Sequence, residues 1–299
     1  MKNENKNWGG IWTEQKLEAF EKYVRAYLTI MLKQRETHNG WPQNIIYFDG
    51  FAGCGYRNII QNNNNNDTLT FSELEIDDEE INVYKGSAER VVKLDKKFDE
   101  YYFIDVEKDA LDKLKNKIEP YFDKNLKYKF LQKDINDALN EFSNYLDKSK
   151  AALILLDPFG MQLNWDSLEK LRGKRVDVWI LLPSGVIINR LLDKKGNLKN
   201  IDRLKSFFGL SEDEIRNEFY NKKIQKTLWD EGETTQKISE PIQQIANLYI
   251  KRLKTIWDFV TEEPLKLYNS RNVPIYHFVF ASNNEIARKI AGDIINPKK

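Results

Sequence analysis

Residues 44–55 of this 299-residue chain read NIIYFDGFAGCG and determine the fold that we expect. The first half, residues 44–49, is a short apolar run that ends in an acid, which is the pattern of a buried parallel strand. The glycines that follow permit a tight turn and let the backbone approach a ligand without a Cβ in the way. Because open α/β sheets bind ligands at the carboxyl ends of their strands, we interpret the segment as a first strand and its ligand-binding loop.

Strand-like and helical stretches alternate along much of the remaining chain. The further strand-like runs cover residues 101–105, 128–131, 152–156, 177–182 and 275–281. Between most of them, apolar residues recur at helical spacing, for example in residues 108–118 and 135–146. This alternation is typical of βαβ units and predicts a Rossmann-like, doubly wound α/β fold with a mostly parallel sheet.

Helices are also expected outside this alternating core. Residues 13–35 carry apolar side chains at helical spacing, and Thr13 is placed to cap the first turn. Ser87 is a second candidate cap, for the helix that follows Gly86. Residues 188–260 contain no convincing strand and predict a helical insertion, and a final helix is expected over 284–294.

We expect one continuous core with two interruptions. Residues 58–80 include five consecutive asparagines and an acidic stretch with little to bury, which is typical of a mobile insertion. The predicted organisation is an N-terminal helical extension at 1–40, a core at 41–187, a helical insertion at 188–262, and a return strand with the final helix at 263–299.

The bulk composition excludes several classes of protein. The 47 basic residues nearly cancel the 46 acidic ones, so no overall positive field attracts nucleic acid, although a local basic face is compatible with these numbers. The single cysteine, Cys54, excludes an internal disulfide, and with only His38 and His277 beside it no structural zinc site is expected. No apolar run reaches the roughly 18 to 20 residues that span a bilayer, so we expect a cytoplasmic protein without a membrane segment.

The glycine loop does not fit two well-known nucleotide loops. A phosphate-binding loop needs Lys and then Ser or Thr after its last glycine, whereas Tyr56 and Arg57 follow Gly55. A dinucleotide fingerprint needs a third glycine where Asn58 stands. The loop suits a cofactor with an amino-acid end, whose ammonium group Asp49 would bind; the alternative is a turn that only connects strand and helix. The candidate cofactor-binding residues of the loop are Asp49, Phe51, Ala52, Gly53 and Gly55.

Acidic residues also end the next two strands. Asp105, followed by Val106, stands where a carboxylate accepts hydrogen bonds from ribose hydroxyls. Asp134, followed by Ile135, would accept a hydrogen bond from an adenine amino group. An aspartate that caps the following helix is the alternative for Asp134. These four residues complete the set of candidate cofactor-binding positions.

The fourth strand runs into Asp157-Pro158-Phe159-Gly160. An enzyme that methylates an exocyclic amine can accept its N–H groups with a side-chain oxygen and a backbone carbonyl, which holds the nitrogen lone pair toward the methyl donor. Asp157 and the carbonyl of Pro158 are the candidates for this catalytic role. Phe159 would stack on a base taken out of a helix; the alternative is a strand-ending turn with Phe159 in the core.

The glycine loop, Asp105, Asp134 and DPFG together resemble class I S-adenosylmethionine-dependent methyltransferases, in particular the FAGxG loop of those that act on nucleic-acid amines. More closely, the chain is similar to the three-Cys-motif partner protein family, TcmP, over nearly its whole length. The residues that carry this resemblance are WT at 12–13, YFDGFAGCG at 47–55, GS at 86–87, FIDVEKDAL at 103–111, LLDPFG at 155–160 and YHFVFASNN at 276–284. The resemblance implies S-adenosylmethionine as cofactor, a class I methyltransferase sheet, a bacterial or phage setting, and a radical-S-adenosylmethionine-like partner that carries the three cysteines.

The acceptor is expected to be a guanine or adenine exocyclic amine in RNA or DNA. The usual amino-methyltransferase motif has two prolines before its aromatic residue, and Phe159 occupies the place of the second. DPFG nevertheless resembles the corresponding segment of tRNA guanine dimethyltransferases. One alternative is a scaffold that binds the cofactor without transferring a methyl group. Another, a metal held by Asp49 and Asp157, is less favoured because no paired acidic motif accompanies them.

Four further features are candidates for a functional role. His277 lies inside an apolar strand, where a lone histidine is typically a satisfied core residue. Cys54 is interpreted as small loop packing, and the basic run at 222–226 as a solvated face rather than a phosphate site. Trp12 and Lys16 are placed to cover the cofactor from the first helix.

Overall fold

A computed structural model describes residues 11–53, 86–123, 126–158, 160–194, 196–226 and 231–297. Three of the predictions fall outside these ranges: Gly55, Phe159 and the insertion at 58–80. Cys54 lies outside them as well.

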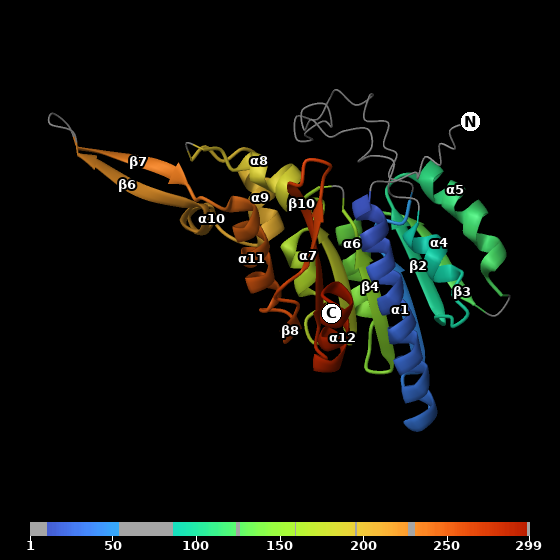
Figure 1. Cartoon of the computed structure of the whole chain (residues 1–299). Helices are drawn as coiled ribbons and strands as arrows, with labels where there is room; N and C mark the ends of the chain where they lie inside the picture. Colours follow the sequence, from blue (N-terminus) through green and yellow to red (C-terminus); the bar gives the residue numbers. More distant parts are fainter. Residues whose placement is uncertain are drawn as a thin grey trace, which may run out of the picture.

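A central sheet of eight strands forms the body of the described chain (Figure 1). Its strands are β1 (Asn44–Asp49), β2 (Glu100–Asp105), β3 (Lys127–Gln132), β4 (Lys150–Leu156), β5 (Val176–Leu182), β8 (Phe259–Val260), β9 (Leu265–Tyr268) and β10 (Pro274–Ser282). The order is β3-β2-β1-β4-β5-β10-β8, and β9 pairs with β10. Strands β1 to β5 are parallel, whereas β10 runs antiparallel to its neighbours. The predicted Rossmann-like, mostly parallel α/β sheet is therefore confirmed.

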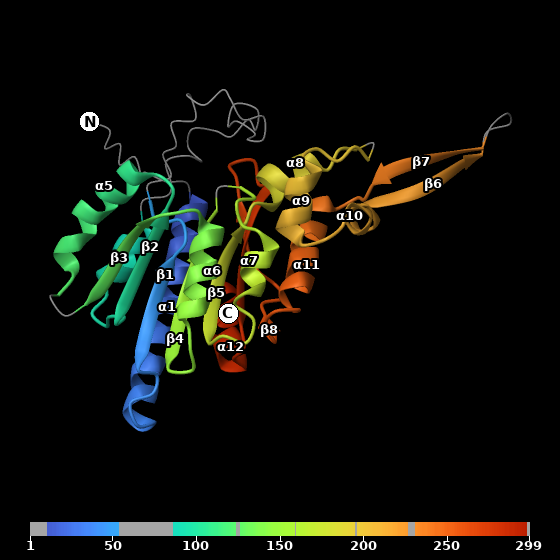
Figure 2. The same ribbon diagram turned by 180° about the vertical axis from the view of Figure 1, so that it is seen from behind.

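Helices cover both faces of the sheet, as a doubly wound fold requires. On one face α1 (Ile11–Thr37) packs against α4 (Ser87–Val92) and α12 (Glu285–Ile295), and α4 packs against α5 (Lys108–Ile118) (Figure 1). On the other face α6 (Ile135–Tyr145) packs against α7 (Trp165–Glu169) (Figure 2). Because both faces are covered, a central strand such as β5 is buried at every residue and reads as a continuous apolar run.

Helix α1 is longer than its apolar pattern predicted. It runs from Ile11 to Thr37, so Thr13 lies inside the helix, its hydroxyl is buried, and the predicted capping role is wrong. Tyr23 attaches the middle of α1 to the sheet: its hydroxyl donates to Asp177 on β5 at 2.7 Å, and its ring packs edge-on against Trp179. The helix therefore contributes to the core rather than to a separate extension.

The caps of two shorter helices differ in how well they were predicted. Gly86 is the N-cap of α4, and Ser87 is its first residue, so Ser87 does not cap the helix as expected. Asn284 caps α12, because its side chain accepts hydrogen bonds from the backbone N–H groups of Ile286 and Ala287. The predicted start of the final helix is thus confirmed to within one residue.

The region after β5 contains strands that the sequence did not reveal. Its helices are α8 (Asn189–Leu191), α9 (Ile201–Phe208), α10 (Glu212–Phe219) and α11 (Pro241–Leu253). Between α10 and α11, however, β6 (Tyr220–Lys226) and β7 (Glu231–Lys237) form an antiparallel hairpin that projects from the body, and β8 follows α11 (Figures 1 and 2). The prediction of an insertion without strands is wrong here, because the sequences of β6 and β7, YNKKIQK and EGETTQK, contain almost no apolar residues from which a strand pattern could be recognised.

Two short turns complete the secondary structure: η2 (Glu119–Tyr121) follows α5, and the π-helical turn η3 (Ser184–Ile188) follows β5. Within the described ranges, no helix combines the length and the apolarity needed to cross a membrane. The return strand predicted at 275–281 is the antiparallel β10.

Replacing Tyr23 with Phe tests how firmly α1 is attached to the sheet. The substitution removes the hydroxyl that donates to the buried Asp177, so we expect the free energy of unfolding to fall by about 1–3 kcal/mol in denaturant titrations. Tyr268→Phe removes an exposed hydroxyl and should change stability by less than about 0.5 kcal/mol. Equal effects of the two substitutions would show that the contact does not hold the helix.

Candidate functional site

Three acids meet where the order of the parallel strands reverses direction. β1 lies between β2 and β4 in the sheet, so the chain leaves β1 toward one edge of the sheet and later returns to its other side. Asp49 ends β1, Asp105 ends β2 and Asp157 directly follows β4. Crevices at such a switch point are the usual ligand sites of open α/β sheets.

The glycine loop is joined to the acid at the end of β2. The backbone N–H of Gly53 donates to Oδ2 of Asp105 at 3.1 Å, and the N–H of Glu107 donates to Oδ1 at 2.8 Å. A Cβ on Gly53 would lie 2.5 Å from Oδ2 of Asp105 and 2.9 Å from Cβ of Ala110, so this position requires glycine. The structure thus brings Gly53 and Asp105 together, as the sequence predicted.

Asp49 lies at the centre of a buried polar cluster. Its side chain is 0% exposed and accepts hydrogen bonds from the hydroxyls of Tyr47 and Ser87 at 2.8 and 3.1 Å, and from the N–H of Phe51 at 3.3 Å. Burial raises the pKa of Asp49 to about 6; the hydrogen bond from Tyr47 opposes this shift, and the negative charge of Asp157 adds to it.

The partners Tyr47 and Ser87 were not identified from the sequence. Tyr47 could have been, because residues two apart in a strand lie on the same face and Tyr47 precedes Asp49 by two. Ser87 could not, because Asp49 and Ser87 are 38 positions apart and the serine also suited a helix cap.

Asp157 forms an ion pair with Lys16 of α1. Lys16 Nζ lies 2.5 Å from Asp157 Oδ2, and the two side chains are only 3% and 6% exposed. The second oxygen, Oδ1, is buried and has no hydrogen-bond partner in the part of the chain that the structure describes. Helix α1 therefore covers the carboxyl end of β4; that Lys16 covers a cofactor there stays a prediction.

Trp12 lies one turn before Lys16 and belongs to the same cover. The Lys16 ammonium lies 5.9 Å from the centre of the Trp12 ring, and that ring stacks on Tyr276 of β10 with centres 5.2 Å apart. A cation over an aromatic face is attracted to it, so Trp12 helps to hold the ammonium beneath the helix.

The remaining candidate residues occupy varied surroundings. Asp134 caps α6: its Oδ1 accepts hydrogen bonds from the backbone and side-chain nitrogens of Asn136 at 2.8 and 3.0 Å, so the alternative of a helix cap describes this residue. Ala52, Ile135 and Pro158 are buried, Phe51 is half-buried and Val106 is exposed. Ile135 packs closely against Gly50, because a Cβ on Gly50 would lie 2.6 Å from Cδ1 of Ile135.

His277 is buried in the core, as expected, but its Nε2 has no hydrogen-bond partner among the described residues, so the histidine is only partly satisfied. Its Nδ1 lies 2.7 Å from the hydroxyl oxygen of Ser184, and both side chains are buried at the carboxyl end of β5. Burial lowers the pKa of His277 to about 4, so the ring is neutral at physiological pH.

The geometry suits recognition of cationic or N–H groups by carboxylates. Two buried acids, one with an unused oxygen, lie at neighbouring strand ends beside a glycine loop tied to a third acid. Among the described residues, no three His, Cys, Asp or Glu side chains are placed to hold a metal ion together.

Comparison with known proteins identifies no family. No protein-family model and no curated protein matches the chain. A crystal structure of a Legionella pneumophila str. Philadelphia 1 protein, described under the family model DUF519, is similar at 15% sequence identity and a TM-score of 0.40, over 93% of this chain and 98% of that chain. The resemblance to the three-Cys-motif partner family stays a prediction, and any function of this chain has to be inferred from its own residues.

The raised pKa of Asp49 predicts how stability depends on pH. The folded chain binds this proton more tightly than an unfolded aspartate with its pKa of 3.8, so the contribution is full below that value and is lost as the pH rises through about 6. In Asp49→Asn this dependence is absent. We expect the difference in unfolding free energy between the variant and the wild type to shift in favour of the variant by about 2–2.5 kcal/mol between about pH 4 and pH 7. A difference that stays constant across this range would contradict the assignment.

Proposed function

We propose that this chain is an S-adenosylmethionine-dependent methyltransferase that acts on an exocyclic amine of a nucleobase in RNA or DNA. The observation that carries the proposal is the group of acids at the switch point, Asp49, Asp105 and Asp157, beside a glycine loop whose Gly53 donates to Asp105. The three acids lie at the carboxyl ends of β1, β2 and β4, and these strands are neighbours in the central sheet.

The acids at the ends of β1 and β2 are of the type that would bind the amino-acid part and the ribose of such a cofactor. Asp105 is half-buried at the end of β2, and its oxygens accept backbone hydrogen bonds from Gly53 and Glu107; a carboxylate at this strand end would also accept hydrogen bonds from ribose hydroxyls. The absence of a Cβ at Gly53 keeps the loop close to that carboxylate. Asp49 carries its negative charge above about pH 6 and would hold an ammonium group. When bound, the cofactor supplies an electrophilic methyl group on a sulfonium.

Asp157 would orient the acceptor amine. Its Oδ2 already binds an ammonium, that of Lys16, whereas Oδ1 is left to accept an N–H from a substrate. An ionised carboxylate accepts hydrogen bonds and donates none, which suits it to receive the N–H groups of an amine. With the carbonyl of Pro158 as second acceptor, the nitrogen lone pair would be held toward the methyl group. The chain then contributes to catalysis by orientation and by exclusion of water.

A scaffold that binds the cofactor without transferring a methyl group is the second candidate. The observation that favours it is the closure of the site: Lys16 and Asp157 are almost fully buried, and Asp49 is not exposed at all. In this candidate the ion pair is structural, and the chain would serve a protein partner of the radical-S-adenosylmethionine type.

Substituting the acids separates cofactor binding from methyl transfer. We expect Asp157→Asn to lower transfer of tritiated methyl groups to total RNA or DNA by about 100-fold or more, because the amine loses its charged acceptor, while calorimetric binding of S-adenosylmethionine is retained. Asp105→Ala should weaken that binding itself, because the ribose loses its acceptor. Glu107→Gln, an exposed neighbour, is the matched control for a lost negative charge.

The same measurements decide between the two candidates. Asp157→Asn leaves Lys16 buried without its full countercharge, so Lys16→Met/Asp157→Asn is assayed beside it to separate lost folding from lost orientation. Binding by the wild type without any labelled product would favour the scaffold. No binding of S-adenosylmethionine by the folded wild type would rule out both candidates.

A further inference from the structure

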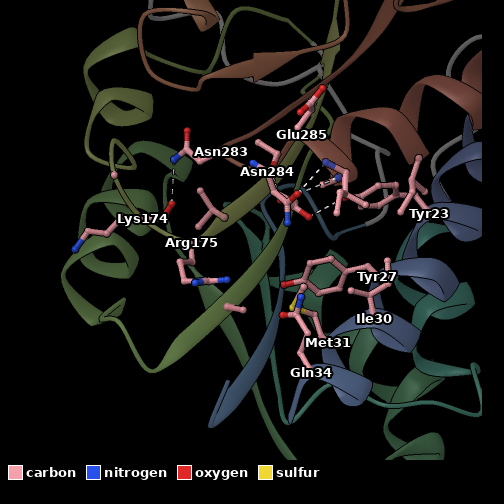
Figure 3. A pocket seen from close by; sticks show the side chains of 18 residues that line it. Tyr23, Tyr27, Ile30, Met31, Gln34, Lys174, Arg175, Asn283, Asn284 and Glu285 are labelled. Carbon is pink, nitrogen blue, oxygen red and sulfur yellow. Dashed lines mark hydrogen bonds between the residues drawn. The ribbon is translucent and has the colours of Figure 1, made fainter. Parts of the chain in front are cut away.

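A pocket lies beside the amino-terminal ends of strands β4 and β5, at the opposite end of the parallel strands from the three acids. It has a volume of about 410 Å³ and opens between α1, the first residues of β4 and β5, and the start of α12 (Figure 3). Along α1, Lys16 of the candidate site and Gln34 of this pocket are 18 positions apart, which corresponds to about 27 Å. The pocket is therefore separate from the site proposed for methyl transfer, and a ligand could bind in it whether or not the chain transfers methyl groups.

Two buried polar atoms in this pocket have no partner within the described ranges. Tyr27 is only 4% exposed, yet its hydroxyl makes no hydrogen bond, and the amide oxygen of Gln34, one of the pocket's lining residues, makes none either. In Figure 3 the hydroxyl of Tyr27 points into the cavity, with the amide of Gln34 close by. Unsatisfied buried polar groups are unfavourable, and their concentration in a cavity indicates a ligand that completes them.

Arg175 provides a cation on the other side of the cavity. Its guanidinium stacks on the ring of Trp41 at 3.7 Å and faces Tyr27 across the pocket (Figure 3). No carboxylate of the described residues lies within ion-pair distance of this guanidinium, and the neighbouring Lys174 donates instead to the carbonyl of Leu146. A stacked guanidinium presents a flat fork of N–H groups that matches a carboxylate.

The rest of the lining defines the size and charge of a ligand. Ile30 of α1 and Ile286 of α12 form an apolar wall, and Ile286 is 64% exposed. Asp177 and Glu285 also line the cavity, so a ligand with more than one negative charge would be repelled. The hydrogen bonds that Asp177 accepts from Tyr23 and Ser282 already occupy both of its oxygens.

We propose that this pocket binds a small monocarboxylate with an apolar body. The carboxylate accepts hydrogen bonds from the guanidinium of Arg175 and the hydroxyl of Tyr27, and the apolar body packs against Ile30 and Ile286. Burial keeps the hydroxyl of Tyr27 protonated, because it raises the pKa of this group far above its ordinary value. The ligand thus gives a partner to the unsatisfied hydroxyl of Tyr27 and adds a carboxylate to a guanidinium that stacks on Trp41 and is attracted by Asp177.

Both a free carboxylic acid and an amino acid carry a carboxylate and an apolar body, and Gln34 distinguishes these two classes of ligand. A free carboxylic acid leaves the amide oxygen of Gln34 without a donor, whereas an amino acid offers it an ammonium N–H. The probes are 3-phenylpropanoate, L-phenylalanine and the neutral 3-phenylpropanol, which have the same apolar part. Binding to the full chain is measured by calorimetry with each probe.

Three variants test the assignment. Arg175→Gln and Tyr27→Phe should each weaken binding of the carboxylate by about 10-fold or more, since each removes a hydrogen bond to a charged group. Lys170→Gln removes an exposed cation, five positions before Arg175, that does not line the pocket, and should leave binding unchanged. Without ligand, Tyr27→Phe should melt at the same or a higher temperature than the wild type, because it removes an unsatisfied buried hydroxyl.

The results of these binding measurements distinguish a ligand-binding site from a cavity that holds only water. Saturable binding of either carboxylate that depends on Arg175 and Tyr27 would support the proposal, and a preference for L-phenylalanine would identify an amino acid as the ligand. Binding of 3-phenylpropanol as tight as that of the carboxylates would overturn it. So would the absence of saturable binding by either acid to the folded wild type, which would mean that water alone completes the polar groups.

Discussion

The buried contact between Lys16 and Asp157 connects two segments that are 141 positions apart in the sequence, and the arrangement of the candidate site depends on it. Removing one member of such a pair leaves an uncompensated charge in the interior, which typically costs about 3–5 kcal/mol. The ion pair thus fixes where α1 lies over the carboxyl end of β4, while apolar side chains of the same helix, such as Phe20, Val24 and Leu28, pack into the core. The hydrogen bond from Tyr23 to Asp177 adds a second attachment near the start of β5. The helix is therefore attached to the sheet at both ends of its parallel strands.

Helix α1 therefore lies against both the candidate site and the pocket beside Tyr27, and these two places differ in their chemistry. Near its beginning, Lys16 supplies a cation to a group of carboxylates. Near its end, Tyr27 and Gln34 supply neutral polar atoms to a pocket whose cation, Arg175, comes from the sheet edge.

The alternating core could be predicted from the sequence because burial on both faces leaves a strong signal. The strands β1 to β5 and the helices α5 and α6 were located to within two residues, since runs such as β5 contain almost only apolar residues. The contact of Gly53 with Asp105 followed from the order of the motifs. The partners of the acids could not be predicted in the same way: Lys16 and Ser87 reach Asp157 and Asp49 only through tertiary packing. The pocket beside Tyr27 was missed because its lining comes from the ends of elements whose local patterns indicate only burial.

The hairpin β6–β7 was missed for the opposite reason: its sequence contains almost no apolar residues, although Tyr220 at its base packs into the core. Its two strands exchange hydrogen bonds with each other alone, while its base is joined to the body by Lys237, whose ammonium donates to the carbonyl oxygens of Asn189 and Leu192. A two-stranded ribbon of this kind can gain or lose residue pairs without disturbing the packing of the central sheet. Natural selection can thus alter the reach of this arm while the hydrophobic interior stays the same.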